Sequence, residues 1–301
     1  MNVTVAGASG LIGTQLVTFL ALTGHKVHRL VRREAPSENT DILWNPAEHR
    51  LDIKDLSQTD AVVCLSGANI AQGRWTSERK RLLRESRIQS VGLLSRTMAA
   101  MDDPPAVLIC ASAVGYYGAH CGSEILTEES AAGDDFLAKL CVDWEVAAGP
   151  AREKGIRVVH LRFGPVLSRR GGLLHKILLQ FKLGLGGVIG KGEQFMSWLS
   201  LDQAVSIIDF ALQTDQLEGA VNATSPNPVT NKEFTKVLAG ILRRPALLPV
   251  PKSAVRLIFG EMGDGLLLGS QCAVPRRLEA AGYAFRHPDL LSALVHVLNV
   301  S

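Results

Sequence analysis

The stretch "VTVAGASGLIG" (residues 3–13) joins a short β-branched run to a turn with three glycines in G-x-x-G-x-x-G spacing. Apolar residues recur with helical spacing through residues 7–25, and "KVHRLVRR" (residues 26–33) returns to strand character. Glycines between a first strand and its helix let backbone amides approach a phosphate closely. The stretch therefore predicts a βαβ unit whose first turn binds a dinucleotide.

The same alternation continues along the chain and indicates the fold class. It predicts a doubly wound parallel sheet of the Rossmann type, an α/β fold with helices on both faces. The strand-like runs cover residues 60–67, 106–114, 156–164 and 219–225, and the helical patterns cover residues 76–101, 134–153 and 200–214.

The alternation ends after about residue 165, where a glycine-rich stretch without strand periodicity begins. Further helical patterns cover residues 230–243, 252–260 and 288–299. We therefore predict a Rossmann domain over residues 1–165, with segments near residues 200–225 returning to it. A smaller, mostly C-terminal substrate lobe is expected over residues 166–301.

Composition narrows the class of protein. The chain has 301 residues, is 47% apolar and carries a net charge of +3, which gives no reason to expect nucleic acid as a partner. Its five cysteines include no C-x-x-C pair, so we expect neither a disulfide framework nor a metal site. No apolar run reaches bilayer length and no signal peptide is visible, so we expect no membrane partner and a cytoplasmic protein. An organelle form whose presequence had been removed would look the same.

The glycine turn and the end of the second strand indicate which dinucleotide binds. An acidic residue about 20 residues beyond the glycines would accept hydrogen bonds from a ribose 2′-hydroxyl, but this chain has Arg32 and Arg33 there. A guanidinium pairs with a 2′-phosphate, so NADP(H) is favoured over NAD(H). The alternative is a solvated basic loop. The residues of the turn expected at the cofactor are Gly7, Ser9, Gly10, Leu11, Ile12 and Gly13.

Several motifs resemble the extended, epimerase-like branch of the short-chain dehydrogenase/reductase superfamily. They are the glycine turn, "CLSGANI" (residues 64–70), "SAVGYYG" (residues 112–118) and "LRFGPVL" (residues 161–167). More narrowly, three stretches resemble an atypical group of NAD(P)-dependent epimerase-family proteins with a C-terminal domain of its own. These stretches are "RWTSERKRLLRESRI" (residues 74–88), "LGLGGVIGKGEQFMSW" (residues 183–198) and "PRRLEAAGYAFRHPDLLSAL" (residues 275–294).

The resemblance implies further cofactor contacts. Leu65, Ser66 and Gly67 would line the adenosine side of the dinucleotide. Arg87 would reach toward the cofactor, with a solvated helix face as the alternative. Arg162 and Val166 would border the nicotinamide half.

The catalytic Tyr-x-x-x-Lys pair of the superfamily is missing from the expected helix. Counting back from Glu145 places Leu137 at the tyrosine position and Cys141 at the lysine position. The usual serine position becomes Ala113, so Ser112 is retained as a candidate for catalysis and for cofactor contact. Lys139 lies two residues away from the lysine position and so faces about 200° around the helix.

Three aromatic residues are candidates for the substrate pocket. Tyr116 and Tyr117 follow the fourth strand at its carboxyl end, where ligands bind. Tyr117 is expected to form a pocket wall, and Tyr116 is the freer candidate for a proton donor, although a wall role is favoured for both. Trp198 is expected as a stacking wall, with a buried core tryptophan as the equal alternative.

Two functions remain open. The first is an NADP(H)-dependent oxidoreductase or epimerase-like enzyme that acts on an unassigned small molecule. The second is an NADPH-binding sensor or regulatory protein with little or no turnover, which the missing Tyr-Lys pair favours. A homodimer is the default expectation for the assembly.

Overall fold

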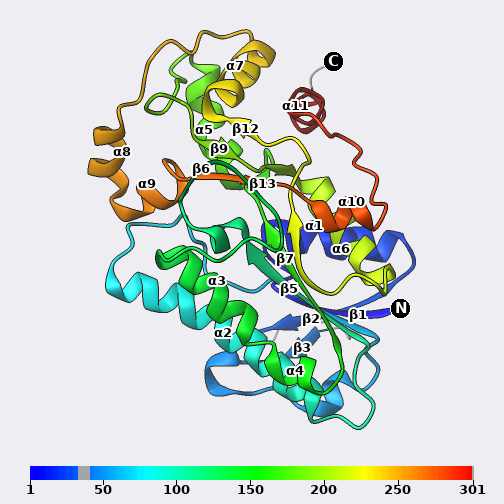
Figure 1. The fold of residues 1–301 in the computed structure, drawn as a ribbon. Helices are drawn as coiled ribbons and strands as arrows, with labels where there is room; N and C mark the ends of the chain where they lie inside the picture. The colour runs from blue at the N-terminus through cyan, green and yellow to red at the C-terminus, as the bar shows by residue number, and fades with distance from the viewer. Residues whose placement is uncertain (33–40, 300–301) are drawn as a thin grey trace.

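A parallel sheet of seven strands forms the centre of the protein (Figure 1). The computed structural model describes residues 1–32 and 41–299. All pairings within this sheet are parallel, which confirms the predicted Rossmann-type fold class. In spatial order the strands are β11 (Gly219–Ala223), β7 (Arg157–Phe163), β5 (Val107–Ala113), β4 (Ala61–Cys64), β1 (Asn2–Ala6), β2 (Lys26–Val31) and β3 (Asp41–Leu43).

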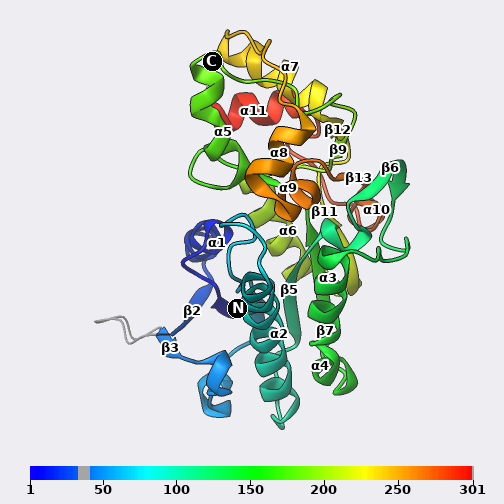
Figure 2. The ribbon, with the colours of Figure 1, turned by 90° about the vertical axis from the view of Figure 1, so that its left-hand side faces the viewer.

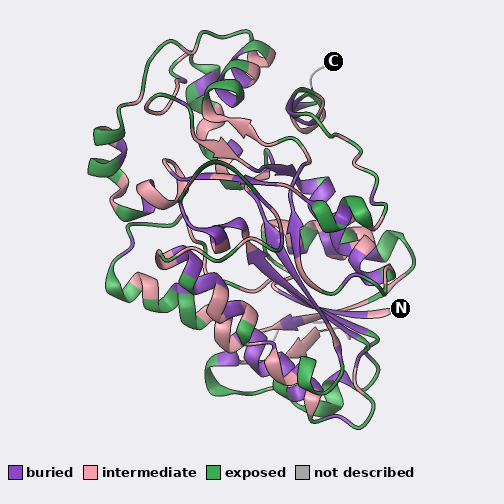
Figure 3. Ribbon diagram, in the orientation of Figure 1, coloured by how far each residue is buried: buried purple, intermediate pink, exposed green. Residues whose placement is uncertain are grey.

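Two groups of helices cover the sheet (Figure 2). In the first, α1 (Leu11–Leu22) packs against α6 (Leu201–Gln213). In the second, α2 (Ser77–Ala99) packs against α3 (Phe136–Val146) and α4 (Gly149–Glu153). Because both faces are covered, the central strands are buried along their whole length, which explains their continuous apolar runs (Figure 3).

A smaller lobe lies at the carboxyl edge of the sheet and has its own core. It contains three two-stranded pairs, β10 with β8, β12 with β9 and β13 with β6. Its helices are α5 (Gly172–Lys182), α7 (Asn231–Leu242), α8 (Lys252–Phe259), α9 (Glu261–Leu266) and α11 (Leu290–Leu298), and α10 (Arg276–Ala280) packs near β11. The short strands are β8 (Val166–Leu167), β9 (Phe195–Met196), β10 (Leu199–Ser200) and β12 (Val229–Thr230).

One strand pair links the two parts of the chain. Strand β6 (His120–Leu126) leaves the Rossmann part and pairs in parallel with β13 (Ser270–Ala273) of the C-terminal part. Most of β6 is exposed and its sequence has no apolar alternation, so no strand is predicted there from the sequence. The boundary at residue 165 therefore stays a prediction.

None of the helices in the described residues is long and apolar enough to cross a membrane.

Candidate functional site

The glycine turn lies between β1 and α1 and is shaped for a phosphate. Gly7 has a φ of +80°, and the Gly10 amide donates to the Gly7 carbonyl oxygen at 3.0 Å. A Cβ on Gly13 would lie 2.1 Å from that same oxygen, so only glycine fits there. No side chain caps α1, which leaves its first amide groups for a ligand.

The other residues of the turn are exposed or half-buried. Ser9 and Gly10 are exposed, and Leu11 and Ile12 are half-buried. A Cβ on Gly7 would lie 2.7 Å from the carbonyl carbon of Leu65, so this turn and the end of β4 are in contact. The structure therefore brings together two segments that the sequence predicted for the cofactor.

The structure describes only part of the region that is predicted to bind the adenosine half of the cofactor. Arg32 directly follows β2 and is exposed, whereas Arg33 lies outside the described residues. Asp41, at the start of β3, is paired with Arg29 at 2.7 Å between Nε and Oδ1. This carboxylate is thus already engaged by a neighbouring strand.

Arg87 is hydrogen-bonded to the loop that follows β4. Its guanidinium donates to the carbonyl oxygens of Ala68 at 3.0 Å and Leu83 at 2.9 Å, and it lies 5.0 Å from the Trp144 ring. The side chain is buried, and burial lowers its pKa to about 10. The solvated-face alternative is therefore wrong, and a Cβ on the neighbouring Gly67 would lie 3.2 Å from the guanidinium carbon.

The two positions predicted to correspond to the Tyr-Lys pair lie in the core. Leu137 and Cys141 are buried on α3, and both approach Gly115, whose added Cβ would lie 3.3 Å and 3.9 Å from them. Burial raises the pKa of the Cys141 thiol to about 12, so this thiol is uncharged at neutral pH. Lys139 is exposed on the same helix.

An ion pair between Arg162 and Glu145 organises the carboxyl ends of β5 and β7. The guanidinium Nε and Nη2 donate to the two carboxylate oxygens at 2.9 Å each. Burial lowers the pKa of Arg162, but the Glu145 carboxylate outweighs it and holds that pKa above the ordinary value. Ser112 Oγ donates to the same carboxylate at 2.7 Å, so its hydroxyl hydrogen is already engaged.

Tyr117 belongs to the same buried network. Its hydroxyl donates to Asn222 Oδ1 at 2.7 Å and accepts from Arg162 Nη1 at 3.1 Å. Burial raises the pKa of Tyr117 to about 12, and only 3% of the residue is exposed. The expectation of a substrate wall at Tyr117 is wrong for this structure, because its ring and hydroxyl are enclosed by protein.

Tyr116 is the more accessible member of the pair. It is half-buried on the short 3-10 turn η3 (Val114–Tyr117), and its ring lies 3.4 Å from the guanidinium carbon of Arg162. Among the described residues, its hydroxyl has no hydrogen-bond partner. Val166, on the opposite side of the β7 end, is half-buried on β8.

Trp198 lies in the core of the smaller lobe. It is 0% exposed, and its indole N–H donates to the Asn227 carbonyl oxygen at 3.2 Å. This burial contradicts the stacking-wall prediction and supports the core alternative, because no face of the indole is open to a ligand.

Two carboxylates, the buried Glu128 and the half-buried Glu145, were not predicted as functional groups. Glu128 Oε1 accepts from the backbone amides of Asn222 at 3.0 Å and Arg277 at 3.2 Å.

Comparisons with known proteins agree with this geometry. Residues 3–223 match the model of the NAD dependent epimerase/dehydratase family. The chain belongs to this family. Residues 250–297 match a second model, a domain of unknown function (DUF1731).

Relatives in the epimerase/dehydratase family cover the whole chain. The "Epimerase family protein Mb2239" of Mycobacterium bovis is 47% identical over 293 residues, which cover 97% of this chain and 96% of that protein. The crystal structure of the human epimerase family protein SDR39U1 with NADPH is 33% identical, covers 99% of both chains and has a TM-score of 0.92. A nucleoside-diphosphate sugar epimerase from Corynebacterium glutamicum is 35% identical with a TM-score of 0.81, over 99% of this chain and 58% of that longer chain.

Proposed function

We propose that this protein binds NADP(H) along the carboxyl ends of β1, β4 and β2. The observation that carries the proposal is the close-packed glycine turn before an uncapped helix, with Arg32 at the end of the neighbouring strand. The human relative crystallised with NADPH supports it. In this arrangement α1 amides hold the pyrophosphate, Leu65 to Gly67 line the adenosine side, and Arg32 binds the 2′-phosphate.

Replacing Arg32 with alanine should weaken NADPH binding by about 10-fold to 100-fold and leave NADH binding within about twofold. The reason is that a charge-assisted contact to the 2′-phosphate contributes roughly 1.5–3 kcal/mol, and NADH lacks this group. Titrations followed by nicotinamide fluorescence measure both constants. Arg81→Ala, at an exposed arginine on α2, is the control. Equal losses for the two cofactors would refute the assignment.

We further propose that the protein is an oxidoreductase or epimerase-like enzyme that acts on an unassigned small molecule. The bound nicotinamide supplies hydride transfer. The protein orients the reacting groups at the carboxyl ends of β5 and β7. There Arg162 is hydrogen-bonded to Glu145, and its guanidinium packs against the Tyr116 ring. A cytoplasmic location and a homodimer stay predictions.

A non-catalytic NADPH sensor is the second candidate, and one observation favours it. Leu137 and Cys141 fill the usual catalytic positions with buried apolar packing, and Ser112 is hydrogen-bonded to Glu145. To separate the two, the protein is mixed with NADPH and its absorbance is followed across a panel of carbonyl compounds and nucleotide sugars. Product isomers are analysed as well, because epimerisation causes no net cofactor change. Tight binding with neither oxidation nor isomerisation would assign the sensor.

Replacing Tyr116 with phenylalanine should leave NADPH binding and any turnover within about twofold of the parent. The phenylalanine ring keeps the contact with the Arg162 guanidinium, and the removed hydroxyl has no partner among the described residues. Steady-state rates on a substrate from the panel provide the measurement. A loss of about 10²-fold to 10⁴-fold in rate alone would instead assign Tyr116 as the proton donor. Tyr117→Phe, which removes an enclosed hydroxyl, should lower stability rather than rate.

A further inference from the structure

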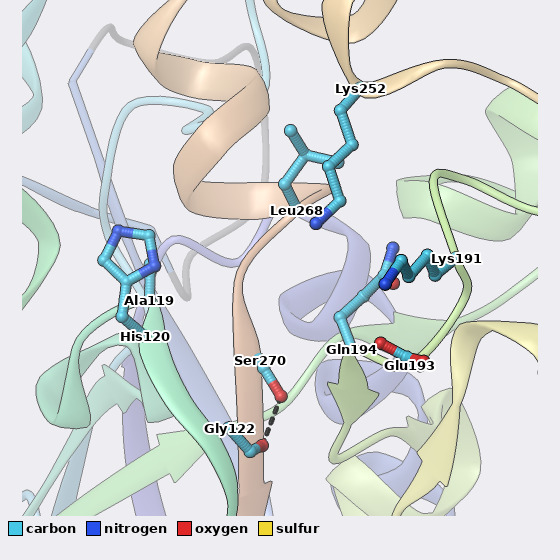
Figure 4. A pocket seen from close by; sticks show the side chains of 9 residues that line it. All are labelled: Ala119, His120, Gly122, Lys191, Glu193, Gln194, Lys252, Leu268 and Ser270. Atoms are coloured by element: carbon cyan, nitrogen blue, oxygen red, sulfur yellow. Dashed lines mark hydrogen bonds between the residues drawn. The ribbon is translucent and has the colours of Figure 1, made fainter.

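A pocket of about 280 Å³ lies in the smaller lobe, outside the proposed cofactor site (Figure 4). Four segments that are distant in sequence meet there: the start of β6, the loop before β9, the start of α8 and the entry to β13. None of the residues proposed for the cofactor lines it. The lining residues are Ala119, His120, Gly122, Lys191, Glu193, Gln194, Lys252, Leu268 and Ser270.

Backbone contacts fix the floor of this pocket. Ser270 Oγ donates to the Gly122 carbonyl oxygen and accepts from the Phe195 amide at 3.0 Å, which ties β13 to β6 and β9. Gln194 Nε2 donates to the carbonyl oxygens of Ile189 and Leu267 at 3.2 Å each. The loop before β9 is therefore held in place before any ligand arrives.

The side chain of Lys252 lies against Gly190. Gly190 has a φ of +61°, and a Cβ on it would lie 2.7 Å from Lys252 Cε. The Gly190 amide also donates to the Val250 carbonyl oxygen at 2.9 Å, so the loop is fastened to the chain just before α8. Lys252 itself is exposed, so its ammonium group is accessible to a ligand.

The residues that line the pocket carry more positive than negative charge. Lys191 and Lys252 supply two cations and Glu193 supplies one carboxylate, and Figure 4 shows both lysines extending over the same space. Within the part of the chain that the structure describes, neither lysine forms an ion pair, and neither does Glu193. The remaining polar groups are the exposed His120 ring and the Gln194 amide.

We propose that this pocket binds the anionic group of a small molecule, a phosphate or a carboxylate, through the ammonium groups of Lys191 and Lys252. Two unpaired cations that line one pocket attract an anion more strongly than either does alone. Hydrogen bonds to such ions are the strong, charge-assisted kind. Glu193 opposes any anion, so it limits the affinity and favours ligands that keep a distance from it.

The test uses the whole protein with saturating NADPH, which fills the glycine turn and prevents anions from binding there. Inorganic pyrophosphate and citrate are titrated separately by calorimetry at low ionic strength, so that the two arms distinguish phosphate from carboxylate. We expect saturable one-to-one binding by at least one of them. The affinity should fall steeply as salt is added, because exposed charges are screened.

Three variants test which side chains raise and which lower the affinity of the pocket for an anion. Lys191→Gln with Lys252→Gln should weaken anion binding at least 10-fold, whereas Lys139→Gln with Lys236→Gln, an equal charge change at exposed lysines elsewhere, should change it less than twofold. Glu193→Gln should tighten binding severalfold, because it removes the one carboxylate among the described residues that line the pocket. A matched loss in both double variants, a weaker Glu193→Gln variant, or no saturable binding by either anion would each overturn the proposal.

NADPH binding is measured in the same samples by fluorescence. If NADPH does not bind, the proposed function fails, and the comparison of the two lysine pairs still decides the pocket. If NADPH binds equally to all variants while anion binding is insensitive to Lys191 and Lys252, the pocket proposal alone fails.

Discussion

Replacing Glu145 with alanine should lower the free energy of unfolding by about 3–5 kcal/mol. Arg162 is 3% exposed and would keep its charge while losing both carboxylate hydrogen bonds. Ser112 would lose its acceptor as well. Urea denaturation followed by circular dichroism measures the change.

The same helix provides a matched control. Asp143 lies two residues earlier on α3 and pairs with Arg84 at 2.8 Å, but both side chains are substantially exposed. Asp143→Ala should therefore cost less than about 1 kcal/mol. Comparable losses of unfolding free energy for Glu145→Ala and Asp143→Ala would show that burial does not strengthen the ion pair between Glu145 and Arg162. If Glu145→Ala does not fold, Glu145→Gln, which keeps one acceptor oxygen, should give a smaller loss of the same sign.

Replacing Gly13 with alanine should weaken NADPH binding by about 100-fold or more. The new methyl group would lie 2.1 Å from the Gly7 carbonyl oxygen, so the turn must open and its amides must move away from the pyrophosphate. Fluorescence titration measures binding, and circular dichroism confirms that the sheet remains folded. An unchanged dissociation constant would refute the proposed cradle.

Gly240 provides a control that separates the steric effect at the glycine turn from a general effect of replacing glycine with alanine. Gly240 lies in α7, and nothing lies within 4 Å of an added Cβ. Gly240→Ala should leave NADPH binding unchanged and stabilise the helix by about 0.5–1 kcal/mol. If Gly13→Ala is unfolded, Gly10→Ala, whose Cβ would lie 3.3 Å from the Gly7 oxygen, provides a milder test.

Local sequence signals were sufficient for six of the seven strands of the sheet. Strands β4 and β5 are short apolar runs followed by polar helical patterns, and such runs form parallel strands covered on both faces. Strand β3 and strand β6 were missed, because three half-buried residues and seven mostly exposed residues carry no such signal.

The candidate site also has a part that the sequence could predict and a part that it could not. Contacts within a few residues, as in the turn from Gly7 to Gly13, follow from spacing, because the chain itself brings these atoms together. Burial by segments far away in sequence decided the surroundings of three residues: Trp198 takes the core alternative, Tyr117 is enclosed rather than a pocket wall, and Arg87 is buried rather than solvated.

By itself, the sequence determined the Rossmann-type fold class and the glycine turn, because periodicity and spacing are local properties of a chain. Only the tertiary structure decided that Glu145 closes a buried network on Arg162 and that β6 pairs with β13. It also decided that Lys191 and Lys252, sixty-one positions apart, line one pocket. These contacts join residues that no periodicity relates, and they form only when the sheet brings the loops at its carboxyl edge together.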